Sequence, residues 1–529
     1  MKGFISFIIA CVLACMSATF MLALIDGNHN WGGDFSQYIA QAKAIIASTI
    51  PTQIANNTLM MSYSDFPYGP NVYPWGYPLL LVPVLAVFGE NLAALKCVNV
   101  ALFLLFIICF YCYVARRFSM GASTALTLAF VLNPMLLVFA SSNILSDIAY
   151  MSASFIAVVV LQAFIITTEQ ARKLHTSAMT SNISKISWGG GHKSLGPLVL
   201  GVLGGICMLY AYLIRSNGIA ILVALCAIHL YYIARIQKQD LKYLALSAVP
   251  YVVFVLGVVL MRYMLDSAGG EGHIAVLVES ISLKSIVRNI LYYAGIWGDF
   301  FALPNPLTLL APSLLESRYA FLLPNPLGLL AWAICLYFLV LGLSECYKRD
   351  MFALLFVGAS LAILILWPPL QGIRFVFSVL PFVVIWIAWG MQKTYSKHPK
   401  LIITMCALLL GYFVLKDSYH LASKHNALPK AILALKSQES HPQAFDLESK
   451  RVYEFIATHT KPNDIIVFFK PRVLYLATNR LSYSTSKLER LDKAQYLLES
   501  SFAPLFDKKQ LAHFSIAYAS EHFTLYALR

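Results

Sequence analysis

Long apolar runs separated by short polar connections dominate the hydrophobic pattern of the chain. A helix crosses the hydrocarbon of a bilayer with about 20 predominantly apolar residues, and eleven runs reach or approach that length. They cover residues 4–25, 97–114, 121–140, 148–168, 196–214, 217–234, 243–261, 325–344, 351–369, 375–391 and 401–415. The pattern predicts an all-α polytopic membrane module of about 11 transmembrane helices within residues 1–416.

The first apolar run also has features of a signal peptide, because Lys2 precedes it. Residues 4–25 are long for that role, and no small-residue cleavage site clearly follows them. We therefore interpret this run as a retained membrane anchor.

Two connections, 26–96 and 262–324, are much longer than the others. The first contains the apolar segment Tyr77–Phe88, whose 12 residues would span only about 18 Å as a helix, too little to cross the bilayer. We expect an interfacial or re-entrant helix, acting as an aromatic belt anchor or as a wall of a groove for a lipid carrier. The second connection is expected to lie along the outer surface and to be able to close over a site.

The composition changes abruptly after residue 416. Residues 417–529 hold 15 Lys and Arg and 11 Asp and Glu, which is typical of a soluble domain. Helices are predicted for 447–460 and near 488–500, and strands for 465–469, 481–485, 514–519 and 523–528. The tail is therefore expected to be a small α/β domain outside the membrane.

Charge indicates the orientation. The chain is 59% hydrophobic and only 12% charged, with a net charge of +14. If the N-terminus is cytoplasmic, the inner connections hold 15 Lys and Arg in 59 residues and the outer ones 8 in 148. The positive-inside rule then places the N-terminus in the cytoplasm and the C-terminal domain outside. Nucleic-acid binding is excluded, since no basic patch with interleaved aromatics lies on a soluble module.

The ten cysteines lie in or at the edges of the apolar runs, which argues against disulfides. No His-x-x-x-His pair offers ligands at the spacing of a metal site.

Four charged residues, Asp34, Asp147, Arg215 and Arg374, fall at the same predicted outer face. Each has a simpler explanation, because an Asp at a helix start can act as a cap and an Arg near a span can snorkel to the interface. Charged residues within or at the ends of spans are nevertheless functional candidates by default. Two arginines on the side that the positive-inside rule leaves poor in Arg favour binding of a phosphate.

Short segments in a fixed order resemble GT-C glycosyltransferases, the group that includes protein O-mannosyltransferases and lipid A aminoarabinose transferases. They are Gly33–Ala42, Tyr73–Leu80, Leu145–Ala149, Arg215–Gly218, Gln371–Pro381 and, in the tail, Phe469–Arg480. The resemblance implies a bacterial inner-membrane enzyme with a periplasmic C-terminal domain. It also implies a polyprenyl-phosphate-linked sugar as donor and a lipid, glycan or protein as acceptor. Family members commonly carry Asp-Glu where this chain has Asp34 followed by Phe35, which weakens the case for a metal there.

The residues then take roles in sugar transfer. Asp34 is the expected base, and Asp147 is expected to orient the acceptor or the neighbours of Asp34. Arg215 and Arg374 are expected to bind the donor phosphate. Aromatic residues are predicted to line a groove for donor or acceptor, namely Tyr38, Tyr73, Trp75 and Tyr77. No metal ligand or cofactor is identified, although a divalent metal is left open. The alternative function is transport or flipping of lipid-linked sugars, for which many helices with charged residues are equally natural.

Overall fold

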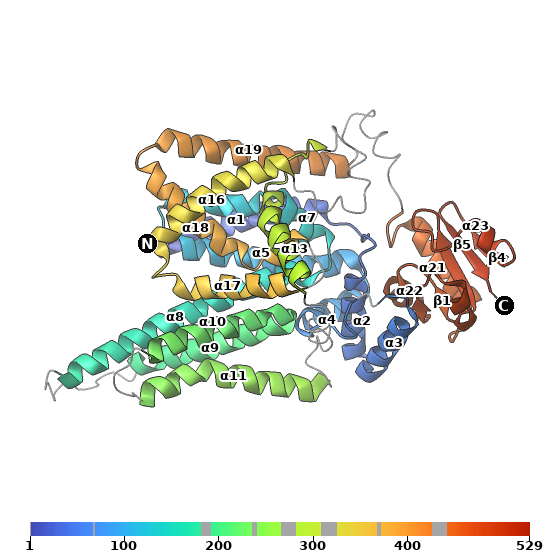
Figure 1. Ribbon diagram of the computed structural model, residues 1–529, viewed down its shortest axis with the longest axis horizontal. Coiled ribbons are helices and arrows are strands. Elements are labelled where there is room, and N and C mark those ends of the chain that lie inside the picture. Colours follow the sequence, from blue (N-terminus) through green and yellow to red (C-terminus); the bar gives the residue numbers. More distant parts are fainter. Residues whose placement is uncertain are drawn as a thin grey trace.

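The computed structural model describes residues 2–66, 69–180, 192–234, 241–265, 282–307, 325–367, 372–425 and 442–528. A helical body occupies most of the molecule, and a separate small domain with a sheet lies at one end (Figure 1). The N-terminus lies at the opposite end of the helical body. Part of the connection 262–324, which was predicted to close over a site, falls outside the described residues.

Every predicted apolar run forms helix in the described residues. The bounds are α1 Lys2–Leu24, α5 Leu92–Val114, α6 Met120–Val131 with α7 Pro134–Ser142, α8 Ser146–Thr180, α9 His192–Ile214, α10 Ile219–Ile233, α11 Leu241–Leu265, α16 Pro326–Cys346, α17 Met351–Leu366, α18 Leu380–Tyr395 and α19 Pro399–Lys424. Within the described ranges, 8 helices are long and apolar enough to cross a membrane, or 9 if α6 and α7 form one bent span. The chain is an integral membrane protein, and its predicted fold class is confirmed.

Local sequence explains the bend between α6 and α7. Proline disfavours helix in the residue before it but fits the first position of a new helix, and Pro134 begins α7. The Asn133 side chain accepts a hydrogen bond from the Leu136 N–H at 3.0 Å and caps the new helix. The two helices are bent by 51° at this break.

Glycines let α16 and α18 pack at backbone distance. A Cβ on Gly342 would lie 1.7 Å from the Trp386 carbonyl oxygen, and one on Gly390 would lie 1.9 Å from the Phe338 carbonyl oxygen. Small residues at such crossings let membrane helices approach closely, so neither glycine can be replaced without moving a helix.

Several shorter helices lie between or beside the spans. They are α2 Asp34–Ile46, α3 Ile50–Tyr63, α4 Gly76–Phe88, α13 Leu283–Gly295 and the 3₁₀ helices η1 Ser216–Gly218, η2 Ile296–Phe301 and η4 Ile373–Val376. α4 is the short apolar helix expected at Tyr77–Phe88, and its 13 residues are too few to cross a bilayer. In Figure 1, α2, α3 and α4 lie between the helical body and the C-terminal domain.

The C-terminal domain is a five-stranded sheet with helices. Its elements are α21 Leu447–His459, β1 Ile466–Val467, α22 Pro471–Thr478, β2 Ser482–Tyr483, η5 Leu488–Lys493, β3 Tyr496–Ser500, α23 Lys508–Leu511, β4 Ser515–Ala519 and β5 Phe523–Ala527. The strand order is β2-β1-β3-β5-β4, with β1 parallel to both β2 and β3 and the β3–β5 and β5–β4 pairs antiparallel.

The helix predicted near residues 488–500 is wrong. This segment is the 3₁₀ helix η5 followed by β3, the central strand of the sheet. Its apolar spacing suits a helix as well as a strand, and pairing of β3 with β1 and β5 decides between them. The predicted domain division at residue 416 falls inside α19, which continues to Lys424; the division itself stays a prediction.

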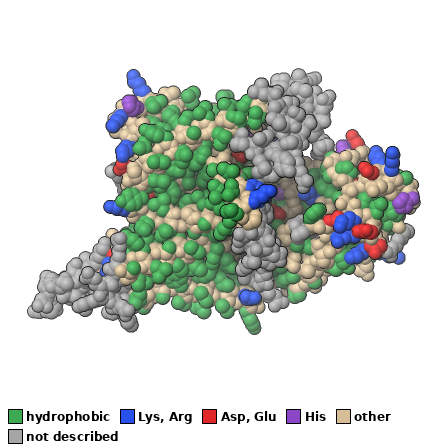
Figure 2. Space-filling model, in the orientation of Figure 1, with side chains coloured by type: hydrophobic (Ala, Val, Ile, Leu, Met, Phe, Trp, Pro, Cys, Tyr) green, Lys and Arg blue, Asp and Glu red, His purple; other side chains and the backbone are tan. Residues whose placement is uncertain are grey.

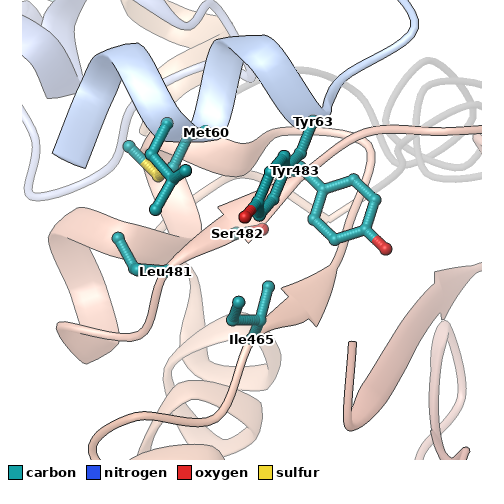
Figure 3. A pocket seen from close by; sticks show the side chains of 7 residues that line it. Met60, Tyr63, Ile465, Leu481, Ser482 and Tyr483 are labelled. Carbon is teal, nitrogen blue, oxygen red and sulfur yellow. The ribbon is translucent and has the colours of Figure 1, made fainter. Parts of the chain in front are cut away.

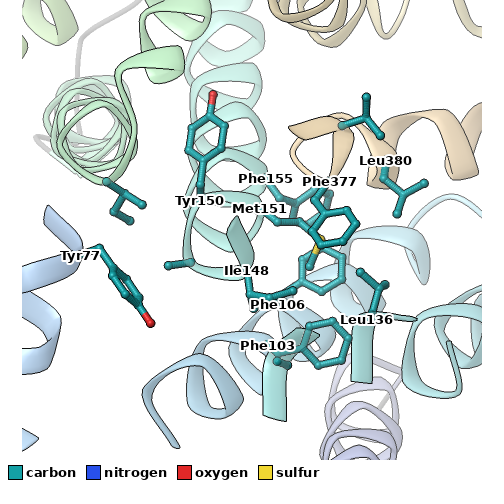
Figure 4. Packing of buried hydrophobic residues seen from close by; sticks show 14 of the residues in the cluster. Tyr77, Phe103, Phe106, Leu136, Ile148, Tyr150, Met151, Phe155, Phe377 and Leu380 are labelled. Carbon is teal, nitrogen blue, oxygen red and sulfur yellow. The ribbon is translucent and has the colours of Figure 1, made fainter. Parts of the chain in front are cut away.

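The core of the helical body contains aromatic and aliphatic side chains from most of its helices. Figure 4 shows Tyr77, Phe103, Leu136, Ile148, Phe155 and Leu380 among them, from α4, α5, α7, α8 and α18. The exposed face of the helical body is mostly hydrophobic, whereas charged side chains lie at its N-terminal end, at its boundary toward the C-terminal domain and over that domain (Figure 2). This distribution fits a body embedded in lipid with polar ends.

Candidate active site

Four breaks in helical structure bring together the four charged residues singled out in the sequence. Asp34 is the first residue of α2, and Asp147 lies in the first turn of α8. Arg215 is in extended conformation between α9 and η1, and Arg374 lies in η4. Helix N-termini favour negative charge, so both carboxylates stand where the backbone stabilises them. Asp34 is not the N-cap of α2. That position is occupied by Gly33, which makes no side-chain cap hydrogen bond.

The four side chains form one charge cluster. Asp147 Oδ1 and Arg215 Nη1 make a close ion pair. Arg374 Nη1 lies 3.6 Å from Asp34 Oδ2 and 3.9 Å from Asp147 Oδ2, so Arg374 bridges the two carboxylates. Two carboxylates face two guanidinium groups, which leaves the cluster formally neutral. The structure thus brings these four residues together, while their chemical roles stay predictions.

Exposure distinguishes the members of the cluster. The Asp147 side chain is 2% exposed, whereas that of Asp34 is 32% exposed. Both guanidinium groups also stack on one ring, with Cζ of Arg215 at 4.2 Å and Cζ of Arg374 at 5.4 Å from the centre of Phe375. Asp147 is thus an interior counter-ion, and Asp34 is the carboxylate that a substrate could reach.

A cavity of about 720 Å³ opens beside the cluster. Its lining consists of Asn30, Gly32, Gly33, Asp34, Val138, Phe139, Asn143, Leu145, Asp299, Gly372, Ile373 and Arg374. Asp34 and Arg374 face this space, while Asp147 and Arg215 stand behind them. The Asp34 carboxylate and the Arg374 guanidinium can therefore both contact a substrate bound in the cavity.

The loop before Asp34 is tied to the loop before Asp147. His29 Nε2 accepts a hydrogen bond from the Ile144 N–H at 3.1 Å, and the Asn30 amide donates to Asn143 Oδ1 at 3.0 Å. Burial lowers the pKa of His29 to about 4, so its ring is neutral and able to accept this bond. These contacts fix the spacing of the two segments that carry the carboxylates.

The four predicted groove residues have different environments. Tyr73 donates a hydrogen bond from its hydroxyl to Asp34 Oδ1 at 2.7 Å. Burial raises the pKa of Tyr73 well above its usual value, and the charge of Asp34 adds to the shift. Tyr38 shares a hydrogen bond of 2.9 Å with Ser146. Trp75 and Tyr77 are fully buried and are not part of the cavity lining, so their place in a groove stays a prediction.

Three further residues near the cluster were missed in the sequence. Asp299, in η2, lines the cavity, and burial raises the pKa of its carboxyl. Lys470 and Arg472 come from the C-terminal domain. Burial lowers the pKa of Lys470, an effect that the nearby charge of Asp34 opposes, and Arg472 contacts Tyr73. The available signals were the position of Asp299 within an aromatic segment and the position of Lys470 and Arg472 within Phe469–Arg480, the tail segment that carries the family resemblance.

The cluster does not fit a divalent metal. Within the ranges that the structure describes, no group of three or more His, Cys, Asp or Glu side chains could hold a metal ion. Asp34 and Asp147 both face guanidinium groups, whose positive charge already balances the carboxylates and would repel a cation.

Comparison with known proteins identifies the fold. No protein-family model matches the sequence, and no curated protein shows a significant sequence match. The oligosaccharyltransferase AglB from Archaeoglobus fulgidus, solved with an inhibitory peptide and a dolichol-phosphate, is 11% identical with a TM-score of 0.51, covering 93% of this chain and 69% of that chain. ArnT from Cupriavidus metallidurans bound to undecaprenyl phosphate is 14% identical with a TM-score of 0.55, covering 98% of this chain and 97% of that chain. The chain therefore has the fold of the GT-C membrane glycosyltransferases.

Proposed function

We propose that the protein transfers a sugar from a polyprenyl-phosphate carrier to an acceptor at the outer face of the membrane. The observation that carries this proposal is the pair Asp34 and Arg374 at the edge of one cavity, with Asp147 and Arg215 behind them. A base and a cation side by side are what attack by a hydroxyl and departure of a phosphate require.

The reaction breaks the bond between the anomeric carbon and the phosphate oxygen of the donor and forms a bond to the acceptor oxygen. Asp34, the more exposed carboxylate, takes the proton from the acceptor hydroxyl. Arg374 stabilises the negative charge that develops on the departing lipid phosphate. Asp147 pairs with Arg215 and holds both guanidinium groups in place, so it acts through them and not on the acceptor directly.

Two observations support a lipid phosphate as the donor carrier. Two structures with this fold were solved with a lipid phosphate, one with dolichol-phosphate and one with undecaprenyl phosphate. The cavity also combines a guanidinium with apolar lining from Val138, Phe139, Leu145 and Ile373, a mixture that suits a phosphate attached to a hydrocarbon chain.

Transport of lipid-linked sugars is the weaker alternative. Transporters hold their charged sites near the bilayer midplane, whereas α2, which begins with Asp34, lies next to the C-terminal domain (Figure 1).

The direct test uses the purified protein with a panel of polyprenyl-phosphate sugars. We expect one donor to be consumed, with release of free polyprenyl phosphate. Asp34→Asn keeps the size of the side chain and removes the base, so turnover should fall roughly 10²- to 10⁴-fold while membrane expression is unchanged. Near-normal transfer by Asp34→Asn would show that Asp34 is not the base. Vesicle-to-vesicle movement of an intact donor, without bond cleavage, would instead establish transport.

A further inference from the structure

The C-terminal domain contacts the segment that carries Asp34, and the contact is made by Trp31 of that segment. The indole N–H of Trp31 donates to the Pro442 carbonyl oxygen at 2.6 Å. Its ring also contacts four phenylalanines of the domain, with centroid distances between 5.0 and 6.2 Å. They are Phe468, Phe469, Phe502 and Phe523. Trp31 is three positions before Asp34, so the base stands close to this aromatic contact.

Arg472 of the C-terminal domain is connected to the same carboxylate through Tyr73. Its Nε donates to Asn57 Oδ1 at 2.9 Å, and its Nη2 donates to the Pro70 carbonyl oxygen at 2.8 Å. Its Nη1 donates to the Tyr73 hydroxyl oxygen at 3.5 Å, and that hydroxyl donates to Asp34 Oδ1 at 2.7 Å. A buried arginine of the C-terminal domain is therefore separated from Asp34 by a single tyrosine.

The chemistry of these groups fixes the direction of the hydrogen bonds. A guanidinium has only donors, whereas a phenol has one proton and can also accept. Arg472 therefore occupies an acceptor position of the Tyr73 oxygen, and the single proton of Tyr73 points to Asp34. The Tyr73 backbone is held as well, since Gln41 donates to its carbonyl oxygen at 2.9 Å and accepts from its N–H at 3.0 Å.

A wider interface joins the domain to α3 and to the loop that follows it. Met60 and Tyr63 of α3 pack on Leu481 and Tyr483 of the domain, with the two tyrosine rings 5.8 Å apart (Figure 3). The Asp65 carboxylate accepts hydrogen bonds from the Thr485 hydroxyl at 3.0 Å and the Ser486 N–H at 2.8 Å. These contacts give the domain a defined position against the site.

From this geometry we infer that the C-terminal domain is a working part of the active site and that Arg472 is a positioning residue for Asp34. Arg472 acts through Tyr73, whose hydroxyl it orients, while Trp31 anchors the segment that carries Asp34. The inference rests on the proposed function only for the role of Asp34 as base; the coupling itself is a property of the fold.

The test compares two buried arginines of the same domain. Arg480 is also buried, but its hydrogen bonds go to Thr460, Thr478 and Ala457 within the domain. Arg472→Lys should lower turnover roughly 10- to 100-fold, the cost of a small misplacement of a catalytic group, with the donor KM little changed. Arg480→Lys is the matched control and should keep nearly normal turnover.

A double variant tests whether Arg472 acts through Tyr73. Tyr73→Phe removes the hydrogen bond to the carboxylate and should also cost roughly 10- to 100-fold in turnover. Adding Arg472→Lys to Tyr73→Phe should cause little further loss, because the two residues act in one chain. Full additivity of the two losses would overturn the inference.

Hydrogen exchange of residues 31–38 gives a readout that does not depend on activity. Exchange there should increase in Arg472→Lys and not in Arg480→Lys. Equal changes in both variants, or none in either, would overturn the coupling. If the wild-type protein transferred no sugar but the exchange result held, the proposed function would fail while the coupling of domain and segment stood.

Discussion

Asp147→Asn gives the sharpest test of the charge cluster. The substitution keeps the size of the side chain and removes one negative charge from a site where the carboxylate is 2% exposed. Two carboxylates and two guanidinium groups now balance; afterwards the cluster would carry a net positive charge, because Arg215 and Arg374 would share only Asp34. Arg215 would lose its close ion-pair partner.

The expected cost follows from burial. Removing one partner of a buried ion pair destabilises a protein by roughly 3–5 kcal/mol, because the other charge is left uncompensated. Arg215 and Arg374 are 16% and 23% exposed, so solvent screens part of this effect. We therefore expect the low end, about 3 kcal/mol, which corresponds to about a 100-fold change in an equilibrium constant.

The assay is the half-life of folded protein in detergent at a fixed raised temperature. Asp147→Asn should shorten it strongly, whereas Asp34→Asn, an identical change at a carboxylate that is 32% exposed, should leave it close to wild type. The double variant Asp147→Asn with Arg215→Gln should recover much of the loss, since removing both partners leaves no unpaired charge. Equal half-lives for Asp147→Asn and Asp34→Asn would refute the reasoning.

Three further outcomes are expected. Arg374→Lys should impair transfer less than Arg374→Ala, because Lys keeps the charge but loses the planar fork, and a loss confined to turnover would assign Arg374 to the departing phosphate; unaltered rates in both folded variants would remove it from the mechanism. Burial raises the pKa of Glu499 from 4.5 to about 7, against hydrogen bonds from the Leu505 and Phe506 N–H groups. The folded state thus binds the proton of the Glu499 carboxyl more tightly than the unfolded state does. The contribution of Glu499 to the free energy of unfolding therefore falls as the pH rises from about 4.5 through about 7. Glu499→Gln should therefore gain thermal stability relative to wild type at pH 8 and not at pH 4, and a gain that is equal at both would contradict the assignment. A reporter active only outside the cytoplasm should work when fused after Lys424 and fail within residues 169–195; the reverse pattern would invert the proposed orientation.

The sequence by itself determined the membrane module and most of its helices. Continuous apolar runs have no stable alternative to helix in lipid, where every backbone polar group must be satisfied internally. Turn chemistry added local boundaries such as the Asn133-Pro134 start of α7. Where pattern was ambiguous, as in residues 488–500, pairing with distant strands decided the outcome, and the sequence prediction of a helix was wrong.

The candidate active site also has features that the sequence reveals and features that only the tertiary structure reveals. Asp34, Asp147, Arg215 and Arg374 could be found in the sequence because a charge at the end of an apolar span is conspicuous. Which carboxylate reaches the cavity, and which is an interior counter-ion, could not be found, since exposure depends on the packing of α2, α8 and η4 against each other. Arg472 lay hidden for a related reason. It is separated from Tyr73 by nearly four hundred positions in the sequence, and only docking of the C-terminal domain on α2, α3 and the loop before α4 brings its guanidinium within one side chain of Asp34. Composition and periodicity fix which segments enter the membrane, whereas the distances between charges across those segments are set by tertiary packing alone.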